Sequence, residues 1–297
     1  MNHCIATALF ALLLCLQASA KTLAMTFDDG LNPETQPNAE TWNASILAML
    51  RTQNIKAMFF PSLRFVGSGS GRELVQRWAA EGHPVGNHTS EHRSLNSPRV
   101  SAAEFIGHVC EAQAAFEHLP TWRPMLRFPY LKEGDTPDKR DIVRRWMREN
   151  GYRHAHVSID ASDWFYSGAL AKIGSESLPQ LRQLYLDHLL ARADYYNALA
   201  QEVLGREPHH VLLLHTNQIN AQWLDDVIRH FRQAGWRFVD PAEAFEDPLY
   251  ALLPASLPAG ESIVWALAKD AGTKGLRYPA EDADYEVPLI RHLLRGD

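Results

Sequence analysis

Two adjacent carboxylates stand at the end of an apolar stretch near the start of the chain. Residues 22–27 are apolar enough to form a buried strand, and Asp28, Asp29 and Gly30 follow directly. Neighbouring carboxylates at the end of a buried strand repel each other and lose hydration, which costs free energy unless a cation or a basic group lies beside them. Taken alone, these residues also fit a simple Asp-Gly turn. The partners that the rest of the chain supplies must decide between the two interpretations.

Two histidines further along the chain have the spacing of metal ligands. His88 and His92 are four residues apart, which on a helix or in a tight turn places both imidazoles on one side. This spacing alone equally fits ordinary surface or core histidines. With a carboxylate from another strand end, however, two histidines leave a coordination position open for water, as in a catalytic zinc site. A metal held there would acidify that water and polarise a carbonyl. Of Asp28 and Asp29, one would then bind the metal and the other would act as a base.

Three more polar residues at predicted strand ends complete a set that fits attack of water on a carbonyl. Arg127 can pair with the carboxylate that acts as base, although without a buried partner it would be a surface ion pair. His215 can serve as a general acid, because imidazole titrates near neutrality. Asp163 can orient that imidazole.

The elements that must position these residues alternate along the chain. Seven strand-like runs are predicted at 22–27, 55–60, 84–87, 124–128, 152–159, 209–214 and 236–239. Helical periodicity, with glycine or a polar stop at the end, predicts helices at 39–53, 72–81, 100–119, 137–150, 178–204 and 221–234. This alternation is typical of a parallel α/β fold.

The positions of the polar residues favour a barrel over an open sheet. Five of the seven predicted strands carry reactive side chains at the carboxyl end. In a β/α barrel these ends converge on one mouth, whereas an open doubly wound sheet uses mainly the loops near one switch point. The first strand is followed by no glycine-rich phosphate loop, which argues against a dinucleotide site. We therefore predict an irregular (β/α) barrel of about seven parallel strands, with the active site at the C-terminal strand ends.

The ends of the chain differ in composition from its middle. Residues 6–16 form an apolar run and Ala18-Ser19-Ala20 is a small-residue cleavage pattern, so residues 1–20 are predicted to be a signal peptide cleaved after Ala20, with a buried N-terminal helix as the alternative. The protein would then be secreted or periplasmic. Residues 21–246 would form the catalytic barrel, and 247–297 a C-terminal extension packed on it, with one helix at 261–269.

Overall composition restricts the possible partners. The chain has 297 residues, 46% of them hydrophobic and 22% charged, with a dispersed net charge of −6. It has no basic patch for nucleic acid, and nothing after residue 20 is long and apolar enough to span a membrane. Outside residues 1–20 the one cysteine is Cys110, expected to be a small core residue, so no disulfide forms within one chain. We expect a monomer.

The reactive segments together resemble the signature of a known family. The motifs TFDDG, HTSEH, RFPY, DASDW and LLLH, in this order, are similar to the five motifs of the polysaccharide deacetylase family, carbohydrate esterase family 4, also described as the NodB-homology domain. The resemblance covers residues 22–241. It implies a distorted (β/α) barrel and a hydrolase with one divalent metal, usually Zn²⁺, with Co²⁺ or Mn²⁺ as alternatives.

The resemblance also implies roles for the first three motifs. Asp28, the first acid of TFDDG, would be the catalytic base, and Asp29 would bind the metal together with His88 and His92. Arg127 would hold Asp28 in place.

Further roles follow for the last motifs. The backbone N–H of Tyr130 would help to stabilise the oxyanion. Asp163 would tune His215, the acid that protonates the leaving amine. Trp164 and Leu213 would line the pocket for the acetyl methyl group; Trp164 could instead be plain core, and Leu213 is a core residue in either case.

One residue and two segments near the predicted mouth of the barrel bear on substrate choice. The residue is Asp160, which either contacts substrate or caps a turn. The link after Asp163 begins with an aromatic-rich loop, residues 164–166, and the first loop, residues 31–43, contains Trp42. These loops would form either sugar-stacking walls or a lid.

The expected function is removal of N-acetyl groups from the amino sugars of a chitin-like or peptidoglycan-like polysaccharide or oligosaccharide. The alternatives are an acetylxylan esterase, a metal amidohydrolase acting on a small non-sugar amide, an inactive carbohydrate-binding homologue, and a purely structural barrel. No residue in the sequence selects the polymer.

Overall fold

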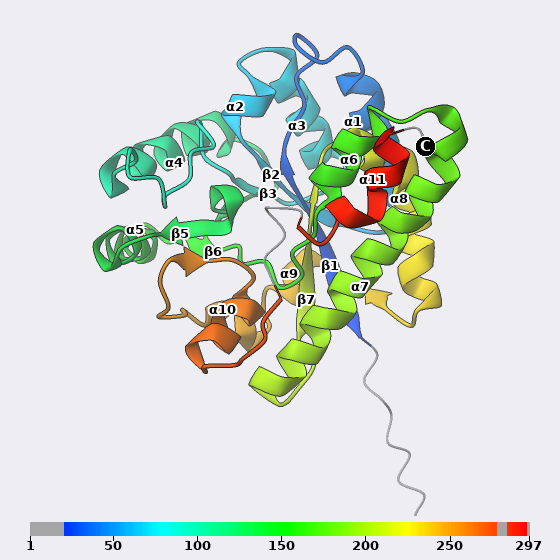
Figure 1. Ribbon diagram of the computed structural model, residues 1–297. Coiled ribbons are helices and arrows are strands. Elements are labelled where there is room, and N and C mark those ends of the chain that lie inside the picture. The colour runs from blue at the N-terminus through cyan, green and yellow to red at the C-terminus, as the bar shows by residue number, and fades with distance from the viewer. Residues whose placement is uncertain (1–20, 278–283, 296–297) are drawn as a thin grey trace, which may run out of the picture.

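A curled parallel sheet forms the centre of the molecule. The structure, a computed structural model, describes residues 21–277 and 284–295 (Figure 1). The sheet has seven strands, in the order β6-β4-β3-β2-β1-β7 with β8 beside β1. Its strands are β1 (Thr22–Asp29), β2 (Ala57–Pro61), β3 (Val85–Asn87), β4 (Trp122–Leu126), β6 (Arg153–His154), β7 (His209–His215) and β8 (Arg237–Phe238). Because all pairings are parallel, the carboxyl ends of these strands lie at one end of the sheet.

Strand β1 is the central strand, and both of its edges are paired. Strand β7 pairs along one edge from Thr22 to Asp28, while β8 and β2 share the other edge, β8 at the amino end and β2 at the carboxyl end. Residues Thr22 to Asp28 are all buried. This explains the continuous apolar run in the sequence, since a strand covered on both faces has no solvent side for polar residues.

The two ends of the sheet meet through the segment that follows β6. Strand β6 pairs with β4, and a few residues later Ile159 forms an isolated parallel bridge with Leu212 of β7. The backbone N–H of Leu213 also donates to the carbonyl of Ile159 at 3.1 Å. This segment therefore links the first and last strands of the sheet order, which confirms the predicted irregular (β/α) barrel.

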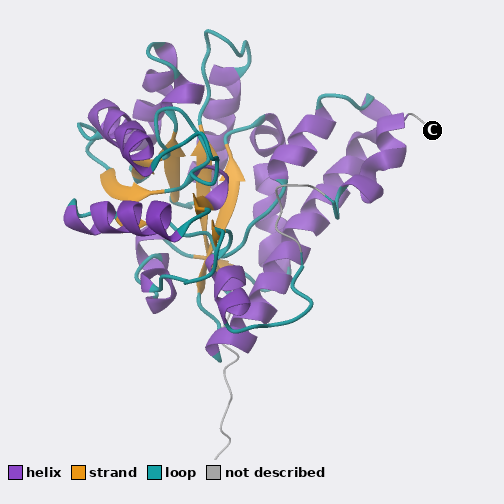
Figure 2. Ribbon diagram, turned by 60° about the vertical axis from the view of Figure 1, so that its left-hand side comes forward, coloured by secondary structure: helices purple, strands orange, loops and turns teal. Residues whose placement is uncertain are grey.

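Helices surround the strands on the outside, as Figure 2 shows. They are α1 (Ala39–Thr52), α2 (Leu63–Val66), α3 (Ser70–Ala80), α4 (Ala102–Phe116), α5 (Pro137–Glu149), α6 (Asp163–Leu170), α7 (Leu178–Leu204), α8 (Gln218–Gln233), α9 (Pro241–Ala244), α10 (Ile263–Asp270) and α11 (Val287–Arg295). Three short 3₁₀ turns lie at Pro129–Leu131, Ser175–Ser177 and Pro248–Ala251. Helix α4 begins two residues later than predicted because the Ser101 hydroxyl caps it, accepting the backbone N–H of Glu104 at 3.1 Å. Among the described residues, no helix combines the length and apolarity of a membrane span.

Residues 247–277 and 284–295 pack against the body of the barrel. Strand β9 (Ala259–Gly260) pairs antiparallel with β5 (Lys132–Gly134), and α10 and α11 both contact α7. The carboxylate of Glu286, just before α11, accepts from buried Arg192 of α7 at 2.9 Å. The predicted signal peptide, residues 1–20, lies outside the described residues.

The structure corrects four local predictions. Residues 164–166, expected in a loop, lie in helix α6, because Tyr166, Ala169 and Leu170 are spaced to bury one helical face. Helix α11, rich in leucine, was missed in the extension. The strand expected at 152–159 has regular pairing only at β6, since the chain then changes partner from β4 to β7. Cys110, expected in the core, is exposed on α4.

Candidate active site

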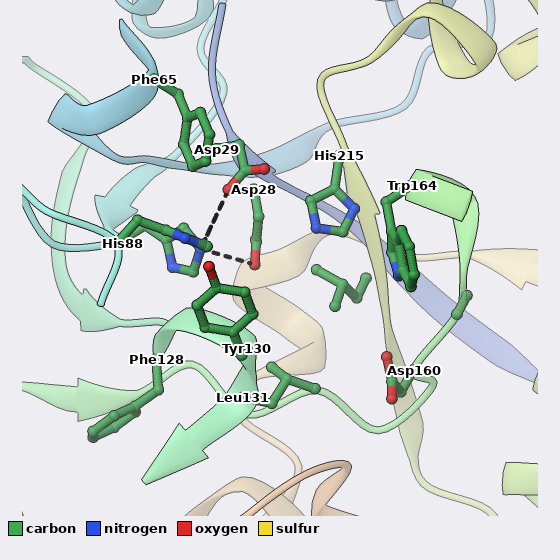
Figure 3. A pocket seen from close by; sticks show the side chains of 13 residues that line it. Asp28, Asp29, Phe65, His88, Phe128, Tyr130, Leu131, Asp160, Trp164 and His215 are labelled. Carbon is green, nitrogen blue, oxygen red and sulfur yellow. Dashed lines mark ion pairs between the residues drawn. The ribbon is translucent and has the colours of Figure 1, made fainter. Parts of the chain in front are cut away.

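The reactive residues meet in a single cavity at the carboxyl ends of the strands. Asp28 and Asp29 end β1, His88 follows β3, and His215 ends β7. The cavity has a volume of ≈ 370 Å³. Figure 3 shows Asp28 and Asp29 between His88 on one side and His215 on the other. The cavity is lined by Asp28, Asp29, Phe65, His88, His92, Phe128, Tyr130, Leu131, Asp160, Ala161, Trp164, Leu213 and His215.

Asp29 faces the two histidines of the HTSEH motif. Its Oδ1 lies 3.3 Å from Nε2 of His92 and 3.6 Å from Nε2 of His88. The histidines lie in a tight loop, where Thr89 and His92 have φ of 65° and 49°. Nδ1 of His88 is 2.7 Å from the carbonyl oxygen of Arg127, so Nδ1 carries the proton and Nε2 keeps its lone pair toward Asp29.

These three residues fit a divalent metal ion. Oδ1 of Asp29 is buried and has no hydrogen-bond partner in the part of the chain that the structure describes. Burial raises the pKa of Asp29 to about 7, although the charge of His215 lowers it. Burial also lowers the pKa of His88 to about 3, so this imidazole is neutral and able to donate a lone pair. An unpaired carboxylate oxygen facing two neutral imidazoles is the donor set expected of a zinc-type site with an open position.

Asp28 is held by a buried guanidinium. Nη1 of Arg127 donates to both carboxylate oxygens, at 3.0 and 3.2 Å, and Nη2 donates to the hydroxyl of Thr26 at 3.2 Å. Nε of Arg127 donates to the carbonyl of Ala155 at 2.6 Å. Burial raises the pKa of Asp28, and Arg127 opposes that rise without cancelling it. Arg127 thus favours the ionised form of Asp28, as its pairing with this carboxylate predicts, while desolvation favours the protonated form.

His215 is coupled to Asp163 on the opposite side of the cavity. Its Nδ1 lies 2.7 Å from Oδ1 of Asp163, and its backbone N–H donates to Oδ2 at 2.8 Å. The side-chain amides of Asn217 and Asn220 also donate to Oδ2, at 2.9 and 2.7 Å. Burial lowers the pKa of His215, but the charge and hydrogen bond of Asp163 outweigh it and raise this pKa to about 10. The imidazole is therefore protonated at neutral pH, as a proton donor must be.

The remaining predicted residues divide between the wall and the layer behind it. Tyr130, Asp160, Trp164 and Leu213 line the cavity, with Tyr130 and Trp164 exposed at its rim. Arg127 and Asp163 do not line it: each lies behind the side chain that it contacts.

Unusual backbone conformations gather around the cavity. Asp29, Thr89, His92, Tyr130 and Leu131 all have positive φ, between 49° and 79°. Such conformations cost about 1–3 kcal/mol each in non-glycine residues and persist where the surroundings impose them. Their concentration here is typical of a site whose geometry serves function rather than stability.

Sequence reasoning missed several residues of the site. Phe128 and Ala161 lie inside the quoted motifs, and the position of Asn217 just after LLLH was a usable signal for a partner of Asp163. Phe65 belongs to the short helix α2, which no motif marks, so only the fold brings it to the cavity.

Comparison with known proteins agrees with this site. Residues 16–155 match the family model for polysaccharide deacetylases. The chain is 31% identical over 167 residues to the chitooligosaccharide deacetylase of Bradyrhizobium sp. (strain ANU 289), covering 56% of this chain and 68% of that protein. It is 26% identical over 233 residues to a peptidoglycan-N-acetylglucosamine deacetylase of Bacillus cereus, covering 75% of this chain and 68% of that protein.

The fold has relatives among solved structures. The chitin deacetylase of Colletotrichum lindemuthianum has a TM-score of 0.53 at 20% identity, over 77% of this chain and 89% of that one. The 31% identity to the chitooligosaccharide deacetylase, of which this chain covers 68%, and the match to the family model show that the chain belongs to the polysaccharide deacetylase family, a family of enzymes that act on C–N amide bonds.

Proposed function

We propose that this protein is a metal-dependent hydrolase that removes N-acetyl groups from the amino sugars of a polysaccharide or oligosaccharide. One observation carries the proposal. The unpaired Oδ1 of Asp29 lies within 3.6 Å of Nε2 of two histidines. Beside it lie the Asp28 carboxylate, which Arg127 holds, and the protonated imidazole of His215, which is paired with Asp163. Family membership supports the same conclusion.

Asp28 acts as the general base in this proposal. Its carboxylate lies at the cavity wall, where it can accept a proton from the attacking water, and the two hydrogen bonds from Arg127 fix its orientation. The contact from Nη1 also keeps the guanidinium charge close to the carboxylate.

Asp29, His88 and His92 would hold the metal. A divalent cation there would lower the pKa of a bound water and polarise the acetyl carbonyl, and we propose Zn²⁺, with Co²⁺ or Mn²⁺ as substitutes.

His215 acts as the general acid, giving its Nε2 proton to the departing nitrogen while Asp163 stabilises the imidazolium. The backbone N–H of Tyr130 helps to stabilise the oxyanion. Trp164 and Leu213 hold the acetyl methyl group, since both line the same cavity.

The named relatives support the proposed substrate class. They are deacetylases of chitooligosaccharides, chitin and peptidoglycan N-acetylglucosamine, all of which carry N-acetylated glucosamine. We propose the same N-acetylated sugar as substrate here. We also propose that residues 1–20 direct export, because of their apolar run and small-residue cleavage pattern, and that the protein acts as a monomer.

Acetate release tests this function directly. The purified protein is incubated with N-acetylglucosamine oligomers and, separately, with acetylated xylan. We expect acetate from the oligomers and a much lower rate from xylan. Acetate from xylan alone would instead identify an ester hydrolase, and binding of oligomers with no acetate from either would identify an inactive carbohydrate-binding homologue.

A further inference from the structure

The DASDW segment, residues 160–164, carries the acid side of the site but is not part of a regular strand. Strand β6 ends well before it, and the residues between them form one isolated bridge, from Ile159 to Leu212 of β7. Asp163, which is paired with His215, lies beyond that bridge at the start of α6. The position of this segment therefore depends on contacts from outside the sheet.

The C-terminal extension holds the backbone just before the DASDW segment. The hydroxyl of Ser262 donates to the carbonyl of Ser158 at 2.8 Å, and the backbone N–H of Ile263 donates to the carbonyl of Val157 at 2.8 Å. All four residues are buried, so water does not compete for these hydrogen bonds. The extension thus fixes the point from which the segment enters the site.

A buried histidine of α7 holds the other end of the segment. Nε2 of His188 accepts the backbone N–H of Ser162, the N-cap residue of α6, at 3.0 Å. Burial lowers the pKa of His188 to about 3, so the ring is neutral, and because Nε2 accepts, its one proton is on Nδ1. The carbonyl of Ser162 accepts the backbone N–H of Phe165 at 3.0 Å, so hydrogen bonds fix Ser162 on both sides.

The extension also contacts the proton-bearing side of His188. Helices α6 and α11 both pack on α7 (Figure 1). Oε1 of Glu286, just before α11, lies 3.4 Å from Nδ1 of His188 and accepts from Nη2 of Arg192 at 2.9 Å. All three side chains are buried. A carboxylate beside Nδ1 favours the proton on that nitrogen and keeps the lone pair of Nε2 free for Ser162.

We propose that the C-terminal extension positions the acid side of the active site, with His188 as the positioning residue between them. Ser162 is bonded directly to Asp163, so the contact from His188 fixes the start of α6 and, with it, the Asp163 carboxylate against Nδ1 of His215. The proposal rests on the proposed function, because it concerns the proton that His215 gives to the departing nitrogen. Proton transfer requires this alignment, whereas the metal ligands and the base lie on other elements.

Two substitutions of His188 separate its hydrogen bond from its bulk. His188→Leu removes the acceptor for Ser162, whereas His188→Gln offers an amide oxygen to Ser162 and an amide N–H to Glu286. His83→Leu is the matched control. His83 is also buried, and its Nδ1 accepts the backbone N–H of Ala57 at 3.2 Å, at the amino end of β2 and away from the cavity.

Each variant is assayed per folded molecule on an N-acetylglucosamine tetramer and on 4-nitrophenyl acetate. A sugar nitrogen needs a proton to depart, whereas nitrophenolate leaves without one, so only the amide reaction depends on the acid. In His188→Leu, kcat on the tetramer falls about tenfold with KM unchanged, while the ester rate stays within about twofold of the parent. His188→Gln recovers most of the tetramer rate, and His83→Leu keeps the parental ratio of the two rates.

A second variant acts on the other end of the segment. Ser262→Ala removes only the hydroxyl that bonds Ser158, and it lowers kcat on the tetramer about threefold with the ester rate again spared. Equal losses on both substrates, or parental kinetics on the tetramer in His188→Leu and Ser262→Ala, would overturn the positioning role.

The NMR signal of the Nδ1 proton of His215 separates this proposal from the proposed function, because it reports the hydrogen bond to Asp163 without turnover. The signal is shifted or lost in His188→Leu and unchanged in His83→Leu. If the signal changes in this way but the parent releases no acetate from the tetramer, the positioning role stands and the deacetylase function fails. If the parent releases acetate and His188→Leu changes neither signal nor rates, the deacetylase function stands and the positioning role fails.

Discussion

Two groups of two histidines and one carboxylate lie among the residues that the structure describes, and they differ in the contacts of the carboxylate. Asp29, His88 and His92 form one group; Glu133, His154 and His156 form the other, and in each the candidate ligand atoms lie within 4.8 Å of one another. In the first, Oδ1 of Asp29 is buried without a hydrogen bond. In the second, Arg144 donates to Oε2 of Glu133 at 3.0 Å, and Nδ1 of His156 lies 3.2 Å from Oε1.

The orientation of the imidazole rings differs as well. The rings of His88 and His92 are inclined by 66°, with centroids 4.8 Å apart, whereas those of His154 and His156 are stacked within 14° at 4.6 Å. The nitrogen lone pair lies in the plane of its ring, so inclined rings can direct two lone pairs at one ion and stacked rings cannot. We infer that the Glu133 group is an ion-pair network that secures β5 beside β6, and that the Asp29 group is the metal site.

Replacing one histidine in each group tests this comparison with the largest expected effect. His88→Ala removes a ligand and should lower deacetylation on the order of 10³-fold or more, since the metal supplies several kcal/mol of transition-state stabilisation. His154→Gln should leave the rate per folded molecule near that of the parent. The metal content of both variants is measured by mass spectrometry alongside their rates. Equal loss of metal in the two variants would refute the inference that only the Asp29 group binds the metal.

A substitution of Asp28 tests the role of the base separately from the role of the metal ligands. Asp28→Asn keeps the shape of the side chain but removes the proton acceptor, so turnover should fall about 10²–10³-fold while bound metal is retained. Steady-state kinetics with metal analysis checks this result. A variant with near-parental turnover would contradict the assignment of Asp28 as base.

Asp163 should control the alkaline limit of activity. In the folded protein Asp163 helps to raise the pKa of His215 to about 10, so the imidazole remains protonated, and able to donate, until the pH approaches that value. Asp163→Asn removes the charge and should move the alkaline limb of kcat/KM down toward the ordinary value of 6.5, with a loss of about tenfold or more at pH 8. An unmoved limb would exclude His215 as the titrating acid.

The two carboxylates should have opposite effects on stability. Glu133→Gln breaks a buried ion-pair network and should lower the free energy of unfolding by about 3 kcal/mol, with little effect on the rate per folded molecule. The pKa of Asp29 is raised to about 7, above its usual 3.8, so its charge destabilises the metal-free protein progressively as the pH rises from about 4 to about 7.

In chelated protein at pH 8, Asp29→Asn should therefore stabilise the fold by up to about 4 kcal/mol, and at pH 4 it should have almost no effect. Urea unfolding at both pH values measures the difference. Destabilisation by Asp29→Asn at pH 8 without metal would mean that Asp29 is a structural residue like Glu133.

Much of the barrel was predictable because its strands are buried on both faces and its helices are amphipathic. The apolar run of β1 and the periodicity of α7 each reflect a local pattern that packing reinforces. Helix α6 could not be predicted in this way, because Trp164 and Phe165 interrupt the pattern of buried Tyr166, Ala169 and Leu170. The buried face of α6 packs against α7 and α8, which follow it in the chain, so the sequence of the segment alone does not show which of its residues are buried.

The site was predictable to the extent that its residues stand at strand ends. Asp28, Asp29 and His215 end strands whose pairing brings them together, so their types and order were informative. Phe65 and the amide of Asn220 reach the site through loops and helix packing, which sequence spacing does not encode. The distinction between the two histidine groups also depended on the structure, since HxxxH and HxH spacing alone says nothing about ring inclination or about Arg144.

The most direct test of the central claim is acetate release during a zinc titration of the chelated, metal-free protein. If the Asp29 group is the metal centre, activity on N-acetylglucosamine oligomers should be absent without metal and rise to a plateau at one zinc ion per chain, with the same endpoint in His154→Gln. Activity that persists after complete chelation, or a plateau that requires two ions per chain and falls to one in His154→Gln, would contradict the account.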